Sequence, residues 1–95
     1  MRFDWDEKKN ASNLRKHGID FNTASLVFDD PMYLPTQDRE VDGEERWQTI
    51  GRADGIVLLL VVHTIEGEDD EEELVRIISA RKADAHERRR YEYGP

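Results

Sequence analysis

Apolar and polar positions in the first third of the chain predict a short strand and two helices. Residues 2–5 alternate polar and aromatic side chains, as a half-buried strand does. A helix is expected over residues 7–17, because Asp6 can cap its first turn and Gly18 can adopt the left-handed conformation that ends it. A second short helix follows and is expected to end near Pro31.

The longest apolar runs lie in the second half of the chain and predict the body of a sheet. Residues 56–63 are apolar almost throughout, so we expect a central strand with both faces at least partly covered. The Asp-Gly pair at 54–55 predicts a tight turn that joins this strand to one over residues 47–52. A last strand is expected over residues 74–80, followed by a final helix over 82–93.

The residues between these two halves predict an edge strand and an exposed loop. Residues 32–34 are flanked by prolines, which a sheet tolerates only at its edge, and residues 36–45 are mostly polar. The order of elements predicts an α+β fold in a single domain over residues 1–95. We expect a compact antiparallel sheet of four or five strands, with two N-terminal helices and one C-terminal helix.

Composition and charge exclude several classes of protein. The 95 residues include 22 acidic and 14 basic side chains, a net charge of −8, which argues against general binding to duplex DNA. The chain has no cysteine, so disulfides and thiolate metal sites are excluded. No histidines are spaced as metal ligands on one helix face, and we expect no metal and no cofactor. The polar N-terminus and the short apolar runs predict a cytoplasmic protein that does not contact a membrane.

An acidic run stands just before the last strand. Seven of the eight residues at 66–73 are acidic, so this segment is expected to be an exposed, mobile loop. An acidic surface of this kind could face a basic partner. One hypothesis is therefore a nucleic-acid mimic that occupies a basic protein surface.

Positive charge gathers at the end of this acidic chain. Six of its fourteen Lys and Arg residues lie between Arg76 and Arg90. Guanidinium groups bind phosphate in a bidentate manner, so Arg76 and Arg81 could hold an RNA backbone or stabilise charge that develops on a phosphate. The alternatives are structural: residues 88–90 could be a solvated helix face, and Arg76 could pair with Glu87 or with another acid.

The three histidines and one tyrosine are the candidates for proton transfer. His17, His63 and His86 could each act as a general acid or base near neutral pH. The alternatives are that His17 stabilises its helix end, that His63 is a rim residue of the central strand and that His86 is solvated. Tyr91 could stack on an RNA base or donate a proton, or it could pack the last helix onto the sheet.

Three segments together resemble a known protein family. They are FDWDEKKNASNLRKHGIDFNTASLVFDDP at the start, GEERWQTIGRADG in the middle and RIISARKADAHERRRYE at the end. They occur in the order typical of the BrnT family and cover roughly residues 3–92. The most specific parts are residues 13–21 and 76–81.

The resemblance implies a fold and a function. BrnT-type proteins are toxins of bacterial type II toxin–antitoxin systems, with a RelE-like ribonuclease fold. The resemblance implies metal-independent RNA cleavage, growth arrest, and neutralisation by a cognate BrnA-like antitoxin with a ribbon-helix-helix part. Operator DNA would be contacted only through that antitoxin. The alternative is a catalytically inactive homologue that binds the antitoxin in operon autoregulation.

Under the toxin hypothesis, two sets of residues are expected to act on RNA. One set would stabilise the transition state or move protons, and the other would bind the RNA backbone. The expected catalytic residues are Arg81, Arg76, Arg52, His17, His63 and Tyr91, and the expected RNA-binding residues are Lys8, Lys9, Lys16, Lys82, Arg88 and Arg89.

Overall fold

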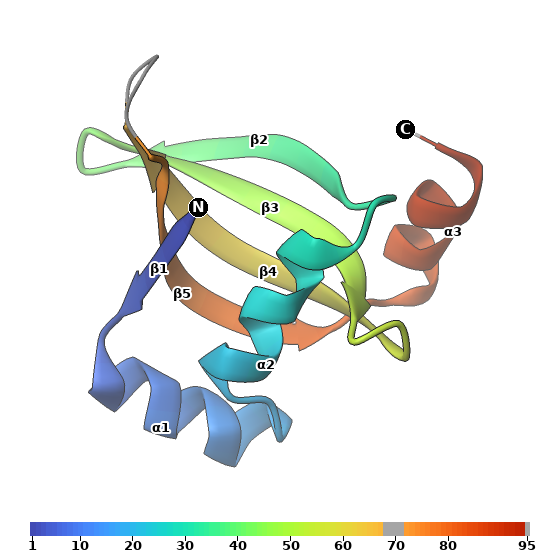
Figure 1. Ribbon diagram of the computed structural model, residues 1–95, viewed down its shortest axis with the longest axis horizontal. Coiled ribbons are helices and arrows are strands. Elements are labelled where there is room, and N and C mark those ends of the chain that lie inside the picture. The colour runs from blue at the N-terminus through green and yellow to red at the C-terminus, as the bar shows by residue number, and fades with distance from the viewer. Residues whose placement is uncertain (68–71, 95) are drawn as a thin grey trace.

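The computed structural model describes residues 1–67 and 72–94, which form one five-stranded sheet and three helices (Figure 1). The strands are β1 (Arg2–Trp5), β2 (Leu34–Val41), β3 (Glu44–Ala53), β4 (Val57–Glu66) and β5 (Leu74–Lys82). The helices are α1 (Glu7–His17), α2 (Phe21–Ser25) and α3 (Ala85–Tyr93), and a 3-10 turn, η1 (Leu26–Asp29), follows α2.

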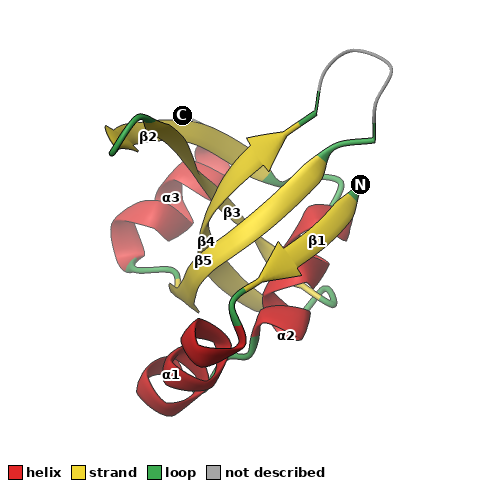
Figure 2. Cartoon of the chain, turned by 90° about the vertical axis from the view of Figure 1, so that its left-hand side faces the viewer, coloured by secondary structure: helices red, strands yellow, loops and turns green. Residues whose placement is uncertain are grey.

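The sheet is mixed, and the expectation of an antiparallel sheet was wrong. Its strand order is β1-β5-β4-β3-β2. The four strands from β2 to β5 are antiparallel neighbours, but β1 runs parallel to β5 at the edge of the sheet (Figure 2). The chain between β1 and β5 is long enough for a crossover connection, and a four-residue strand pattern carries no information on direction.

The expectation of a loop over residues 36–45 was also wrong. These residues form most of β2, the turn at Asp42-Gly43 and the start of β3. Both turn residues have positive φ angles, 52° and 79°, as a two-residue hairpin requires. β2 is an edge strand and largely exposed, so it does not need the apolar pattern by which a strand is recognised in a sequence. Its charged side chains discourage pairing with the strands of other chains.

Local signals define the two longer helices. The Asp6 side chain accepts hydrogen bonds from the N–H groups of Lys8 and Lys9, and Gly18 has a left-handed φ of 71°. The final helix begins at Ala85 rather than at residue 82, because Lys82 still pairs with β4. Asp84 caps this helix.

Two apolar clusters lie on opposite faces of the sheet, since successive residues of β4 project to opposite sides. Leu59 and Val61 face α2 and η1, whereas Leu58 and Leu60 face α3. Figure 1 shows α2 and η1 crossing in front of the sheet, while α3 lies beyond its other side. Gly51 lets η1 approach β3 closely, because a Cβ there would come within 2.7 Å of the Val27 side chain.

The acidic run is described only in part. Residues 68–71 lie outside the described residues, and so does the expectation that they form a mobile loop. Glu66 ends β4, and the Glu72 carboxylate lies 3.1 Å from the N-terminal amine and 3.8 Å from Nε of Arg2. Within the described ranges, no helix has the length and apolar character needed to cross a membrane.

Candidate functional site

The side chain of Asn13 fixes α1 against the sheet where β1 ends. Its Nδ2 donates hydrogen bonds to the carbonyls of Ile19 (2.9 Å) and Ala80 (2.8 Å), and its Oδ1 accepts one from the Ala80 N–H (3.1 Å). The buried amide thus pairs with the edge of β5 as a strand residue would. This contact sets the position of the neighbouring surface residues of α1.

A groove runs between α1 and β5 and contains four of the residues expected from the sequence. It consists of two adjoining depressions with cavity volumes of about 500 and 280 Å³, and both are lined by Lys9 and Ile78. Arg76 lines the first, and Lys16 and His17 line the second. We call this the α1–β5 groove. The four expected residues are Arg76, Lys9, Lys16 and His17.

Arg76 pairs with an acid, as the structural alternative expected, and this acid is Asp4 rather than Glu87. The two residues are opposite each other in the parallel β1–β5 ladder, and Nη2 of Arg76 lies 3.0 Å from Oδ2 of Asp4. Both side chains are about half exposed, 55 % and 47 %. Exposed ion pairs of this kind contribute little free energy, so a phosphate can compete with Asp4 for the guanidinium group.

Arg81 is held more firmly, by Glu87 of α3. Its Nη1 and Nη2 each lie 2.8 Å from one carboxylate oxygen of Glu87, and Glu87 also accepts a hydrogen bond from the Asp84 N–H. The hydrogen bond from Arg81 lowers the pKa of Glu87, and the same bond raises the pKa of Arg81. Because the carboxylate is buried, this pair joins the end of β5 to the first turn of α3.

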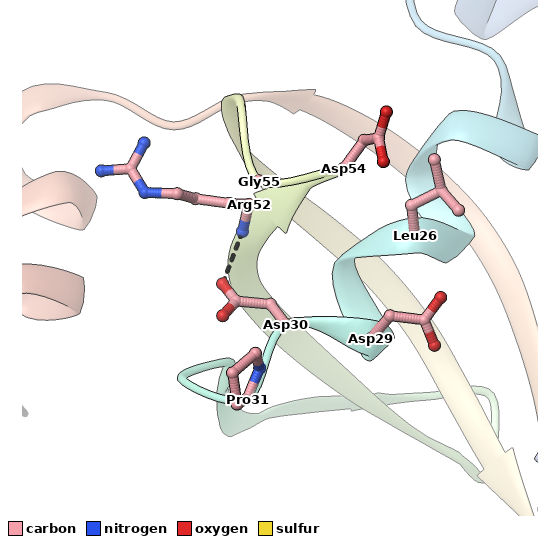
Figure 3. Close-up of a pocket in the computed structure, with 7 residues that line it drawn as sticks. All are labelled: Leu26, Asp29, Asp30, Pro31, Arg52, Asp54 and Gly55. Atoms are coloured by element: carbon pink, nitrogen blue, oxygen red, sulfur yellow. Dashed lines mark hydrogen bonds between the residues drawn. The ribbon is translucent and has the colours of Figure 1, made fainter.

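Arg52 lines a separate depression, of about 280 Å³ (Figure 3), and its guanidinium group contacts Tyr91 of α3. The guanidinium carbon of Arg52 lies 5.5 Å from the centre of the Tyr91 ring, and Figure 3 shows this side chain directed away from Asp29 and Asp54. The Tyr91 hydroxyl donates to Oδ2 of Asp30 at 2.6 Å, and the Arg52 N–H donates to the same oxygen at 2.8 Å.

These contacts give Tyr91 a structural role. Burial raises the pKa of the Tyr91 phenol, and the carboxylate of Asp30 raises it further. Burial alone would raise the pKa of Asp30, but its hydrogen bonds from Arg52, Tyr91 and Met32 lower it below the usual value. The Tyr91 hydroxyl already donates its proton in a hydrogen bond to Asp30. The alternative that Tyr91 packs the last helix onto the sheet therefore describes it better than proton donation does.

His63 is part of the core and not a rim residue. It is 0 % exposed, its ring lies edge-on to Phe28 at 4.9 Å, and Nε2 lies 2.7 Å from the Thr49 hydroxyl. Burial lowers the pKa of His63 to about 4. The imidazole is therefore neutral near pH 7 and has no contact with solvent through which to reach a substrate.

We expect His63 to make the protein sensitive to acid. Its folded-state pKa lies below the unfolded value of about 6.5, so the unfolded state binds the proton first. Stability is therefore complete above pH 6.5 and falls by up to about 3 kcal/mol as the pH drops toward 4. Urea unfolding at a series of pH values measures this slope. His63→Gln should abolish it between pH 6.5 and 5, the exposed His86→Gln should keep it, and an unchanged slope in His63→Gln would contradict the assignment.

The remaining basic residues expected to bind RNA lie in two separate regions of the molecule. Lys8 is exposed on α1, while Lys82, Arg88 and Arg89 are exposed at the end of β5 and on α3. Figures 1 and 2 both show α1 and α3 apart from each other, so the two sets do not form one patch. No cluster of His, Asp and Glu that could hold a metal ion occurs among residues 1–67 and 72–94.

Sequence reasoning missed two residues of the groove region. Trp5 lines the groove beside Arg76, although its sequence pattern indicates only a core residue. Asn13 lies within the family-like segment at 13–21, but its contact with Ala80 joins positions 67 residues apart. Only the pairing of β1 with β5 brings these residues together.

Comparisons with known proteins agree with this fold and with the sequence resemblance. The family model described as "Ribonuclease toxin, BrnT, of type II toxin-antitoxin system" matches residues 5–87. The crystal structure of the Brucella abortus ribonuclease toxin, BrnT, is similar, with a TM-score of 0.61 and 24 % identity over 88 % of this chain and 97 % of that one. A search of curated proteins gave no match. The chain therefore belongs to the BrnT family of ribonuclease toxins of type II toxin–antitoxin systems.

Proposed function

We propose that this protein is a metal-independent endoribonuclease with a RelE-like fold, the toxin of its toxin–antitoxin pair. The α1–β5 groove is the observation that carries this proposal. Arg76 and Lys9 line one of its two depressions, and Lys9, Lys16 and the exposed His17 line the other. Cations bind the RNA backbone, and an exposed imidazole can transfer protons near neutral pH.

The chemistry needs no cofactor. The 2′-hydroxyl of one nucleotide attacks the adjacent phosphorus while His17 accepts the hydroxyl proton. Arg76 stabilises the negative charge that develops on the phosphate oxygens. The bond to the 5′ oxygen breaks, and that oxygen takes a proton from the ammonium group of Lys9 or Lys16. The products are a 2′,3′-cyclic phosphate and a free 5′-hydroxyl.

The partner follows from the family. A toxin of a type II system is neutralised by a protein antitoxin. We propose a BrnA-like antitoxin with a ribbon-helix-helix part, which would contact operator DNA on behalf of the complex. The net charge of −8 supports the assignment of DNA contact to the antitoxin, because an acidic toxin is poorly suited to binding duplex DNA. Toxin and antitoxin would act together in the cytoplasm, where the RNA substrate lies.

Expression of the wild-type protein without its antitoxin is expected to arrest growth. The purified protein is expected to cleave single-stranded RNA in the presence of EDTA and to leave 2′,3′-cyclic phosphate ends. End-group analysis of the fragments measures this outcome. His17→Gln is the matched variant, and it should remain folded while cleavage falls about 10²–10⁴-fold, as for loss of a general base. Cleavage that EDTA abolishes would overturn metal independence.

One observation favours the second candidate, an inactive module that only binds the antitoxin. Both arginines of β5 are paired with carboxylates, Arg76 with Asp4 and Arg81 with Glu87. If neither arginine can be recruited by a phosphate, the groove binds no RNA. This candidate predicts an antitoxin complex, no growth arrest and no RNA cleavage.

A further inference from the structure

The larger depression of the α1–β5 groove has an aromatic wall. Trp5 ends β1, and its partly buried indole both packs on the apolar cluster around Phe21 and lines this depression of about 500 Å³. The Trp5 and Phe21 rings meet edge-on, with their centres 6.1 Å apart, so they do not stack on each other. Ile77 and Ile78 of β5 line the same depression. The volume and the apolar wall are typical of a site for a small flat ligand.

The carboxylate of Glu7 is fixed beside this indole. Its Oε1 accepts a hydrogen bond from Nε1 of Trp5 at 2.8 Å, and its Oε2 accepts one from Nδ2 of Asn10 at 3.3 Å. Each carboxylate oxygen can accept two hydrogen bonds, so within the described residues each oxygen of Glu7 has one more to accept. Glu7 is exposed and lines the depression, so it can accept two parallel hydrogen bonds from a ligand that lies on the indole.

The other two acids of the depression are less suited to this role. Asp4 is paired with the guanidinium group of Arg76, which offsets its charge. Oδ1 of Asp6 accepts both of the hydrogen bonds that cap the first turn of α1. Glu7 is therefore the acid of this depression that best accepts a pair of hydrogen bonds.

We propose that this depression holds a guanine base of the RNA next to the link that is cleaved, with the base stacked on Trp5 and paired with Glu7. The inference rests on the proposed function, because the base belongs to the same RNA. Guanine presents two adjacent donors, N1–H and the 2-amino group, on its Watson–Crick edge, whereas the other three RNA bases present an acceptor beside each donor. A carboxylate only accepts hydrogen bonds, so it favours guanine.

The distribution of charge favours a nucleotide over an arginine side chain of the antitoxin, which can also stack on an indole and pair with a carboxylate. Arg76 and Lys9 line this depression. Lys9, Lys16 and His17 line the adjoining one, where the described lining residues include no acid. A nucleotide uses both parts, since its uncharged base lies at Glu7 and its phosphates lie at the cations. An arginine would be repelled by Arg76 and Lys9.

The first test changes the RNA and leaves the protein intact. The probe is a 2′-O-methyl oligouridine with one guanosine, which lacks the attacking hydroxyl and is not cleaved. Inosine in place of guanosine lacks only the 2-amino group, so binding should weaken about tenfold, the effect of one hydrogen bond to a charged group. Adenosine should weaken binding further, because its N1 places an acceptor opposite the carboxylate. The corresponding ribo-oligonucleotides should be cut beside this position at rates that fall in the same order.

Protein variants test the two contacts separately. Glu7→Gln keeps an oxygen for Nε1 of Trp5 but replaces the other acceptor with a donor, so the difference between guanosine and inosine should disappear. A merely structural role of Glu7 would not change this difference. Glu92→Gln is the matched control, since it removes an exposed carboxylate of α3, away from α1, and should leave the difference unchanged. Trp5→Leu should weaken binding about 5–150-fold, the effect of one stacked base.

Fluorescence follows Trp5 in the folded protein. The chain has two tryptophans, and Trp47 lies on β3, separated from β1 by two strands of the sheet. Trp47→Phe therefore isolates the emission of Trp5 and should bind the probe as the wild type does. Saturation with the guanosine probe should quench this emission, because a stacked base contacts the indole directly.

The outcomes distinguish the guanine site from the proposed function. The site is overturned if guanosine, inosine and adenosine are bound and cut alike, or if the guanosine probe leaves the Trp5 emission unchanged; the ribonuclease proposal would then stand alone. It is also overturned if Trp5→Leu and Glu7→Gln weaken only the antitoxin complex, which would assign the depression to an antitoxin arginine. If the wild type cleaves no RNA but still prefers the guanosine probe, the ribonuclease proposal fails and the guanine site remains.

Discussion

Arg76→Ala is expected to slow RNA cleavage by about 10²–10³-fold, which corresponds to about 2.7–4 kcal/mol of transition-state stabilisation. The guanidinium group stands where the groove meets the sheet and is half exposed, so it can reach a phosphate. Its ion pair with Asp4 is exposed, so the substitution should change the free energy of unfolding by less than about 1 kcal/mol. A cleavage assay and a urea unfolding curve on the same preparation measure both effects.

Asp4→Asn is the matched control for this prediction. It releases Arg76 from its carboxylate partner and removes a negative charge from the groove, so RNA affinity should rise or stay unchanged. If Asp4 itself moved a proton, cleavage would fall in Asp4→Asn as it does in Arg76→Ala. Full cleavage in Arg76→Ala would remove Arg76 from the proposed mechanism and would favour the inactive binding module.

Elements with local signals are predictable from this sequence. Asp6 and Gly18 lie directly at the ends of α1, and the bounds found, Glu7–His17, are those predicted. Asp54-Gly55 likewise marks the turn between β3 and β4, where both residues have positive φ. In each case the residue that determines the structure lies within a few positions of the element that it ends.

Elements that depend on distant partners are not predictable in this way. β2 contains charged residues and no apolar run, and it is a strand only because β3 offers it an edge. The direction of β1 is set by its pairing with β5, which follows about seventy residues later. A single sequence without structure shows neither partner.

The candidate site shows the same difference between local signals and distant partners. Arg76 stands out in the sequence because it interrupts an apolar strand, but its neighbours Asp4 and Thr64 come from two other strands. His63 stands out as a histidine near the end of a strand, yet the strand lies between two covered faces and buries it. Residue type identifies candidates for chemistry, and the register of the sheet decides which of them reach a common surface.

Arg81→Ala is expected to destabilise the protein by about 2 kcal/mol, mainly because it leaves the buried carboxylate of Glu87 without its cation. Removal of one partner from a fully buried ion pair costs about 3–5 kcal/mol, and the smaller value allows for the partial exposure of Arg81. For a chain of this length, the loss corresponds to a decrease in Tm of roughly 10 °C. Thermal unfolding followed by circular dichroism measures it.

Arg81→Ala combined with Glu87→Gln separates a structural role of Arg81 from a catalytic one. The glutamine removes the unpaired charge and can still accept the hydrogen bond of the Asp84 N–H, so the cap of α3 persists. The double variant should recover at least half of the lost stability. Its cleavage rate should then return to within about tenfold of the wild type, because Arg81 holds α3 in place without touching the phosphate. A double variant that is as stable as the wild type but still about 10²-fold slower would show that Arg81 stabilises the transition state directly.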